Sequence, residues 1–96
     1  MFHHVVMLSL IEPLEQKDYD FIVGACEEIK RELPGVLSIR FISNLSNRSA
    51  SYSHAFVADF VDEAAHDAYQ QAPIHVPLKK KVGELSNKLV VLDYSV

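Results

Sequence analysis

The spacing of apolar residues changes several times along the chain, and each change marks an expected element. Residues 2–11 are almost continuously apolar before Pro13, which predicts a strand that is buried on both faces. From residue 15 to residue 33 the apolar positions recur at intervals of three and four, which predicts an amphipathic helix. Leu33-Pro34-Gly35 is expected to end that helix, because proline cannot continue the hydrogen-bond ladder and glycine permits a left-handed turn.

The second half of the chain returns to strand patterns and then to helical ones. Residues 36–43 and 52–60 are rich in β-branched and aromatic residues, and they predict two strands joined by a polar loop. Asp62 is the expected N-cap of a short helix over residues 63–71, which Ala72-Pro73 ends. A further helix is predicted over residues 74–85, with Pro77 tolerated in its first turn, and a last strand over residues 89–94.

This order of elements predicts an α+β fold in one domain over residues 1–96. The protomer is expected to be ferredoxin-like, βαββαβ, with a four-stranded antiparallel sheet. The helices of one chain cover only one face of such a sheet, whereas the strand patterns are apolar on both faces. The simplest cover for the second face is the sheet of another copy, related by a twofold axis. We therefore expect a homodimer whose two sheets form a dimeric α/β barrel.

Composition and charge limit the classes of partner. The chain of 96 residues has a net charge of −4, and its one basic run, Lys79–Lys81, points in different directions around a helix, so no nucleic-acid partner is expected. Cys26 lies among apolar positions and is interpreted as a small buried hydrophobe rather than a nucleophile. The first residues lack the cationic region of a signal peptide, and no apolar run reaches transmembrane length. We therefore expect a cytoplasmic protein with no membrane partner.

Short motifs are distributed, in order, over nearly the whole chain. They are His4-Val5-Val6, Leu33-Pro34-Gly35-Val36, Tyr52-Ser53-His54-Ala55, Phe60 with Asp62-Glu63-Ala64, Tyr69, Pro73-Ile74-His75, and Val90-Val91-Leu92-Asp93-Tyr94. Each motif is short, but their order and spacing make the chain resemble the stress-responsive α/β-barrel domain family, called Dabb, within the dimeric α+β barrel superfamily. The resemblance implies a ferredoxin-like protomer and a homodimer in which two sheets enclose a barrel.

The resemblance implies little about a reaction. Many members of the family are known only as domains linked to stress responses. One plant branch cyclises polyketides without cofactor or metal, using a histidine and a tyrosine for acid–base chemistry, and other branches of the wider group are cofactor-independent monooxygenases. The chain departs from the family at two positions: Ala72 stands where a histidine often precedes the Pro-x-His stretch, and Ser9 stands where the first strand often carries a lysine.

The resemblance and the strand alternation together predict a candidate site. The expected pocket residues are His4, Val6, His54 and Phe56, and the expected catalytic residues are Tyr69, His75 and Asp93. In an enzyme, His75 would be the base, and Asp93 would accept a hydrogen bond from its imidazole and fix its orientation. Tyr69 would hold a substrate oxygen or donate a proton. These groups suit proton abstraction next to a carbonyl.

A structural role stays open for each of these residues. His75 and Asp93 would then tie the last strand to the helix corner, and Tyr69 would be a core residue whose hydroxyl reaches solvent. His4 and His54 would be partly buried, satisfied histidines. His3 is expected to face away from the pocket and His66 to lie on an exposed helix side, and no function is assigned to either.

Neither a metal nor a cofactor is expected. No two histidines have helical i, i+4 spacing, there is no Cys-His cluster, and the three glycines are too widely separated to form a phosphate loop. Two functions remain. One is a small homodimer that binds an apolar or aromatic small molecule, or acts in a stress response without a defined reaction. The alternative is a cofactor-free cyclase, isomerase or monooxygenase.

Overall fold

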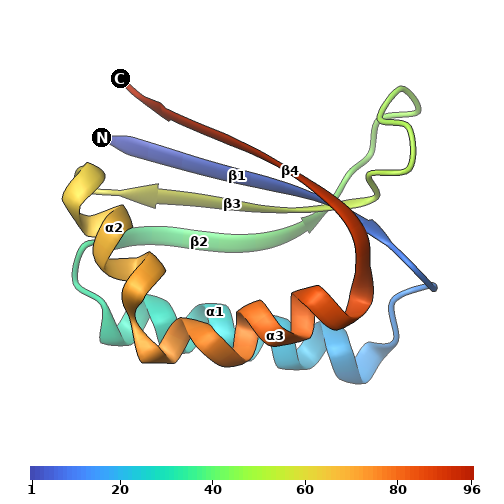
Figure 1. Cartoon of the computed structure of the whole chain (residues 1–96), viewed down its shortest axis with the longest axis horizontal. Helices are drawn as coiled ribbons and strands as arrows, with labels where there is room; N and C mark the ends of the chain where they lie inside the picture. The colour runs from blue at the N-terminus through green and yellow to red at the C-terminus, as the bar shows by residue number, and fades with distance from the viewer.

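The computed structural model describes all 96 residues as one four-stranded antiparallel sheet with helices on one side (Figure 1). The elements are β1 (Phe2–Leu10), α1 (Gln16–Glu32), β2 (Val36–Ser43), β3 (His54–Phe60), α2 (Glu63–Gln71), the 3-10 helix η1 (Pro73–His75), α3 (Val76–Leu85) and β4 (Ser86–Ser95). The strand order is β2-β3-β1-β4. The predicted ferredoxin-like βαββαβ arrangement is therefore confirmed.

Most element bounds follow the apolar spacing of the sequence. Asp62 is the N-cap of α2, as predicted, and its side chain accepts a hydrogen bond from the backbone N–H of Ala65 at 2.8 Å. β3 begins at His54, later than predicted, and the hydrogen bonds of the two preceding residues, Tyr52 to Ser49 and Ser53 to Leu8, lie outside the regular ladder. β4 begins directly after α3, at Ser86, and so extends beyond the predicted range at both ends.

Gly35 has a different role from the one predicted. No glycine in the structure has a positive φ, so Gly35 does not supply a left-handed turn after α1. Instead, α2 approaches the backbone at this point, and a Cβ on Gly35 would lie 2.5 Å from the Cβ of Ala65. Only a residue without a side chain fits there, so Gly35 allows the close packing of α2 against the start of β2.

The core lies between the sheet and the helices. Its fully buried side chains come from β1, β3 and α1, and the largest are Phe60, Leu8, Ile22 and Ile29. Cys26 of α1 is part of this core, and burial raises the pKa of its thiol to about 12, so the sulfur stays protonated at neutral pH. This agrees with its interpretation as a small hydrophobe.

The opposite face of the sheet has no helix over it (Figure 1). Apolar residues of both edge strands are exposed there: Ile42 of β2 is 43% exposed, and Val90 and Leu92 of β4 are 48% and 58% exposed. His3 lies on this face, as predicted, and its Nδ1 donates a hydrogen bond to Asp59 Oδ1 at 2.5 Å. We call this the open face of the sheet.

Candidate functional site

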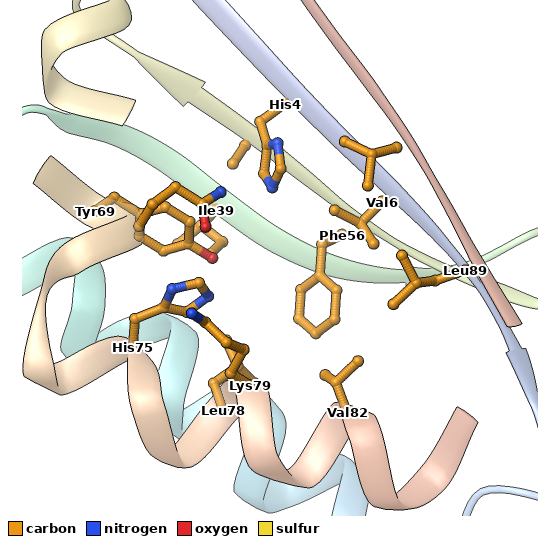
Figure 2. Close-up of a pocket in the computed structure, with 13 residues that line it drawn as sticks. His4, Val6, Ile39, Phe56, Tyr69, His75, Leu78, Lys79, Val82 and Leu89 are labelled. Carbon is orange, nitrogen blue, oxygen red and sulfur yellow. The ribbon is translucent and has the colours of Figure 1, made fainter. Parts of the chain in front are cut away.

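A cavity of about 270 Å³ lies between the helix-facing side of the sheet and α3 (Figure 2). Nine of its 13 lining residues are hydrophobic. Val6, Phe56 and Val82 form part of its apolar wall, and Tyr69, His75 and His4 bring polar atoms to one end. Five residues that the sequence assigned to the site therefore line one cavity, namely His4, Val6, Phe56, Tyr69 and His75.

The proline after α2 brings Tyr69 and His75 together. α2 ends at Gln71, Ala72 has an extended backbone, and Pro73 begins the short helix η1 that carries His75. The imidazole of His75 then stacks on the ring of Tyr69, with 4.0 Å between the ring centroids. Both side chains are buried. The interruption of the helix at Ala72-Pro73 therefore forms the polar end of the cavity.

Both of these groups are uncharged at neutral pH. Burial lowers the pKa of His75 to about 4, and the positive charge of Lys79 lowers it further in the same direction. Burial also raises the pKa of the Tyr69 phenol above its ordinary value. The Nδ1 atom of His75 is buried and has no hydrogen-bond partner. The cavity thus offers a phenol O–H and a neutral imidazole to a bound molecule.

The predicted hydrogen bond between His75 and Asp93 is wrong. Asp93 stands directly opposite His4 in the β1–β4 ladder, and its Oδ1 accepts a hydrogen bond from His4 Nδ1 at 2.5 Å. A carboxylate can only accept, so Nδ1 of His4 is the donor, and the other ring nitrogen, Nε2, is not used by this hydrogen bond. Asp93 therefore orients His4, which lines the cavity, and Asp93 itself does not line it.

The assignment of His54 to the cavity is also wrong. His54 is on the helix-facing side of the sheet, but it pairs with Leu8, four residues along β3 from the residue that pairs with His4. Four residues of strand span roughly 13 Å. His54 stacks on Phe41 with 5.3 Å between ring centroids and lines a separate hollow beside Tyr19.

His66 is buried, whereas the sequence placed it on an exposed helix side. Its ring lies 4.6 Å from the ring of Phe2 and 4.6 Å from that of His4, measured between centroids. Burial lowers its pKa, and its Nε2 accepts a hydrogen bond from the Gln70 amide at 3.0 Å. The signal in the sequence is the spacing of three residues between His66 and Tyr69, which puts both on one helix face.

The chain that contains this cavity matches a known family. The model of the "Stress responsive A/B Barrel Domain", Dabb, matches residues 2–96. None of the curated proteins matches the chain. In addition, no helix of this chain is long and apolar enough to cross a membrane.

Similar solved structures cover almost the whole chain. A hydroxynitrile lyase from Passiflora edulis has a TM-score of 0.84 at 21% identity, with 99% of this chain and 92% of that one covered. A dimeric ferredoxin-like protein of unknown function from Jannaschia sp. CCS1 has a TM-score of 0.79 at 28% identity, with 99% and 98% covered. A second such dimeric protein, from Thermobifida fusca YX, has a TM-score of 0.81 at 18% identity, with 99% and 90% covered.

Proposed function

Since this chain belongs to the stress-responsive A/B barrel domain family, we propose that it is a homodimer that binds an apolar or aromatic small molecule. The observation that carries this proposal is the cavity of about 270 Å³, which is mostly apolar and has polar atoms gathered at one end. This combination is typical of small-molecule sites, where apolar walls supply affinity and a few polar groups fix orientation.

The size and chemistry of the cavity limit the ligand. A cavity of about 150 Å³ already accommodates benzene, and drug-sized ligands occupy roughly 300–1,000 Å³. A cavity of about 270 Å³ therefore suits one substituted ring. Tyr69 supplies a hydroxyl and Lys79 an ammonium group at the cavity wall, and both can donate to oxygen. We expect the ring to carry a carbonyl, hydroxyl or carboxylate group.

The open face of the sheet supports the homodimer. Its exposed apolar residues lie on the two edge strands, β2 and β4, so apolar surface is exposed at both sides of the sheet. Several exposed apolar residues on one uncovered sheet face are typical of an interface. A second copy presents the same apolar face, and the similar structures from Jannaschia and Thermobifida are described as dimeric. The name of the family supports a stress-related role for the protein.

Acid–base catalysis is the second candidate, and the His4–Asp93 pair is the observation that favours it. His4 Nδ1–H donates to Asp93, so the lone pair on Nε2 is free to accept a proton from a molecule in the cavity. Tyr69 would stabilise or protonate the oxygen of the same molecule. His4 would then be the base, a role that was expected of His75 from the sequence. A hydroxynitrile lyase among the similar structures is an example of an enzyme with this fold.

The binding proposal is tested by methyl NMR with phenol, benzoate and acetophenone as probes. We expect saturable shifts of the methyl groups of Val6, Leu78 and Val82, which line the cavity, and none at Leu92 on the open face. The matched control is Val82→Phe, which fills the cavity and should abolish the shifts. Shifts that survive in Val82→Phe, or that occur only at Leu92, would exclude the cavity as the binding site.

The catalytic candidate has its own test with the same probe. Proton abstraction next to the carbonyl of acetophenone exchanges its methyl protons for deuterium in D₂O, and NMR measures the rate. If His4 is the base, His4→Gln and Tyr69→Phe should each slow the protein-catalysed exchange by about 10²–10⁴-fold. A wild-type protein that binds acetophenone without accelerating exchange would reject catalysis on this carbonyl class and leave binding as the function.

A further inference from the structure

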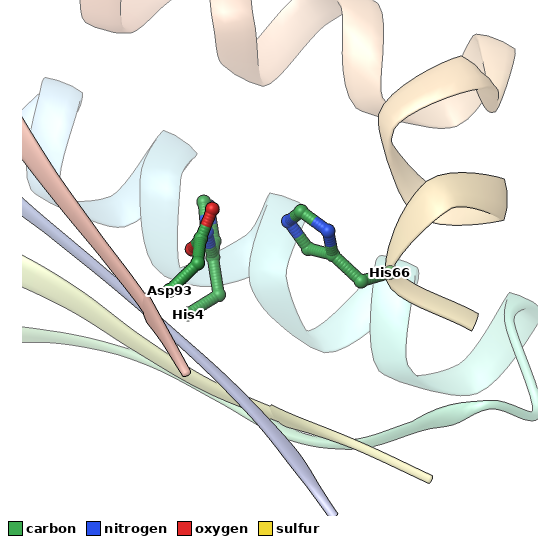
Figure 3. A group of neighbouring side chains, drawn as sticks. All are labelled: His4, His66 and Asp93. Carbon is green, nitrogen blue, oxygen red and sulfur yellow. The ribbon is translucent and has the colours of Figure 1, made fainter. Parts of the chain in front are cut away.

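Three side chains with metal-ligand chemistry meet beside the cavity. They are His4 of β1, His66 of α2 and Asp93 of β4, and one ligand atom of each lies within 4.8 Å of the other two. Figure 3 shows the His66 imidazole directed toward the His4 and Asp93 side chains. Both histidines are buried, and the Asp93 side chain is 36% exposed. Asp93 is therefore the most solvent-exposed of the three side chains.

We propose that this cluster binds a divalent transition-metal ion of the zinc type, with His4, His66 and Asp93 as its three protein ligands. Two imidazoles and one carboxylate form a ligand set that suits Zn²⁺ and Co²⁺. Mg²⁺ and Ca²⁺ prefer oxygen ligands, so two imidazoles disfavour them. No metal was expected from the sequence, because the three ligands lie far apart along the chain and come together only in the fold.

The side chains need only small movements to take up a metal. Ligand atoms around a zinc ion at about 2.0–2.2 Å lie roughly 3.4 Å from one another. The ligand atoms of the cluster lie within 4.8 Å of one another, so small side-chain rotations would bring them to the separation that zinc requires. His4 Nδ1 and Asp93 Oδ1 are already 2.5 Å apart in a hydrogen bond, and metal binding would release the proton of that bond to solvent. His66 would give up its hydrogen bond with Gln70, whose amide is free to turn toward the cavity it lines.

The metal would lie at the border of the cavity. Three protein ligands leave a fourth tetrahedral position for water, as in open zinc sites. His4 is both a ligand of the cluster and part of the cavity wall, whereas His66 and Asp93 do not line the cavity. Loss of His66 or Asp93 therefore removes the metal without removing the cavity. An experiment can therefore disprove the metal site while small-molecule binding persists, or disprove small-molecule binding while metal binding persists.

The test is isothermal titration of tag-free protein with Zn²⁺, supported by the visible absorption of bound Co²⁺. We expect one ion per chain in the wild type. His66→Gln and Asp93→Asn should each weaken Zn²⁺ binding by at least about 100-fold, since even outer-shell partners of a metal contribute about 10–100-fold. The matched control is His54→Gln, which removes a histidine outside the cluster and should leave the affinity unchanged.

Two results would overturn the metal site. One is the absence of saturable binding by the wild type at one ion per chain. The other is binding that survives both His66→Gln and Asp93→Asn but is lost in His3→Gln. His3 pairs with Asp59 on the open face and has no third ligand near it, so this result would place the ion outside the cluster. Circular dichroism establishes that each variant is folded before titration. If His66→Gln does not fold, Asp93→Asn decides the question, because Asp93 is at the edge of the sheet and its amide can still accept from His4.

Discussion

His75 is the residue whose protonation the fold opposes most strongly. Its ring is buried, its Nδ1 lacks a partner, and burial and Lys79 lower its pKa from 6.5 to about 4. Between these two values the unfolded chain binds a proton at His75 that the folded chain does not bind. The stability contribution of neutral His75 is therefore fully present above pH 6.5 and is lost as the pH falls toward 4.

Replacement of His75 by phenylalanine tests this pH dependence. His75→Phe keeps a ring on Tyr69 but cannot titrate. Between pH 7 and pH 4 the wild type should lose about 3 kcal/mol more unfolding free energy than the variant, because each pKa unit corresponds to about 1.4 kcal/mol. Urea unfolding at several pH values measures the difference. Identical pH profiles would show that His75 is readily protonated in the folded state.

Part of the candidate site could be predicted residue by residue. Strand alternation put His4 and Val6 on one face of the first strand, since the period of two is a local property, and the resemblance placed them with Phe56 in one pocket. The partner of Asp93 could not be found in this way, because it depends on the register between β1 and β4. His66 was misplaced because several alanines surround it in α2, and alanines do not define which helix face is buried.

At the scale of elements, the packing of α2 against the start of β2 depends on Gly35. Gly35→Ala would place a Cβ 2.5 Å from that of Ala65, and such overpacking costs typically about 1–3 kcal/mol. The matched control is Gly83→Ala in α3, where no atom lies within 4 Å of the new Cβ. That change should stabilise the protein by roughly 0.5–1 kcal/mol. Urea unfolding of both variants at pH 7 measures the contrast, and effects of the same sign would contradict the close packing.

Some element boundaries are harder to predict than the elements themselves, because they depend on contacts between residues that are far apart in the sequence. Local spacing was sufficient for the bounds of β2 and α2, because apolar periodicity and the Asp62 cap act within one segment. The start of β3 depends instead on a hydrogen bond from Ser53 to Leu8, which is far away in the sequence. Gly35 likewise follows α1 where the sequence placed it, but it is required for contact with α2 and not for the conformation of a left-handed turn.

At the scale of the whole molecule, the proposed homodimer depends on the open face of the sheet. Leu92 is 58% exposed at this face, and Leu92→Glu would put a charge into the interface. We expect sedimentation at micromolar concentration to give twice the chain mass of 10.8 kDa for the wild type and a monomer for the variant. Leu45→Glu is the control, because Leu45 is 95% exposed in the loop between β2 and β3. A monomeric wild type would rule out a second copy of the chain as the partner that covers the open face.

A crystal structure of the protein with its tightest-binding aromatic probe tests the proposed site most directly. We expect the ring between Phe56 and Val82 in the cavity, with its oxygen within hydrogen-bond distance of the Tyr69 hydroxyl. A probe bound only on the open face, with side chains closing the space beside His75, would contradict the assignment of this cavity as the functional site.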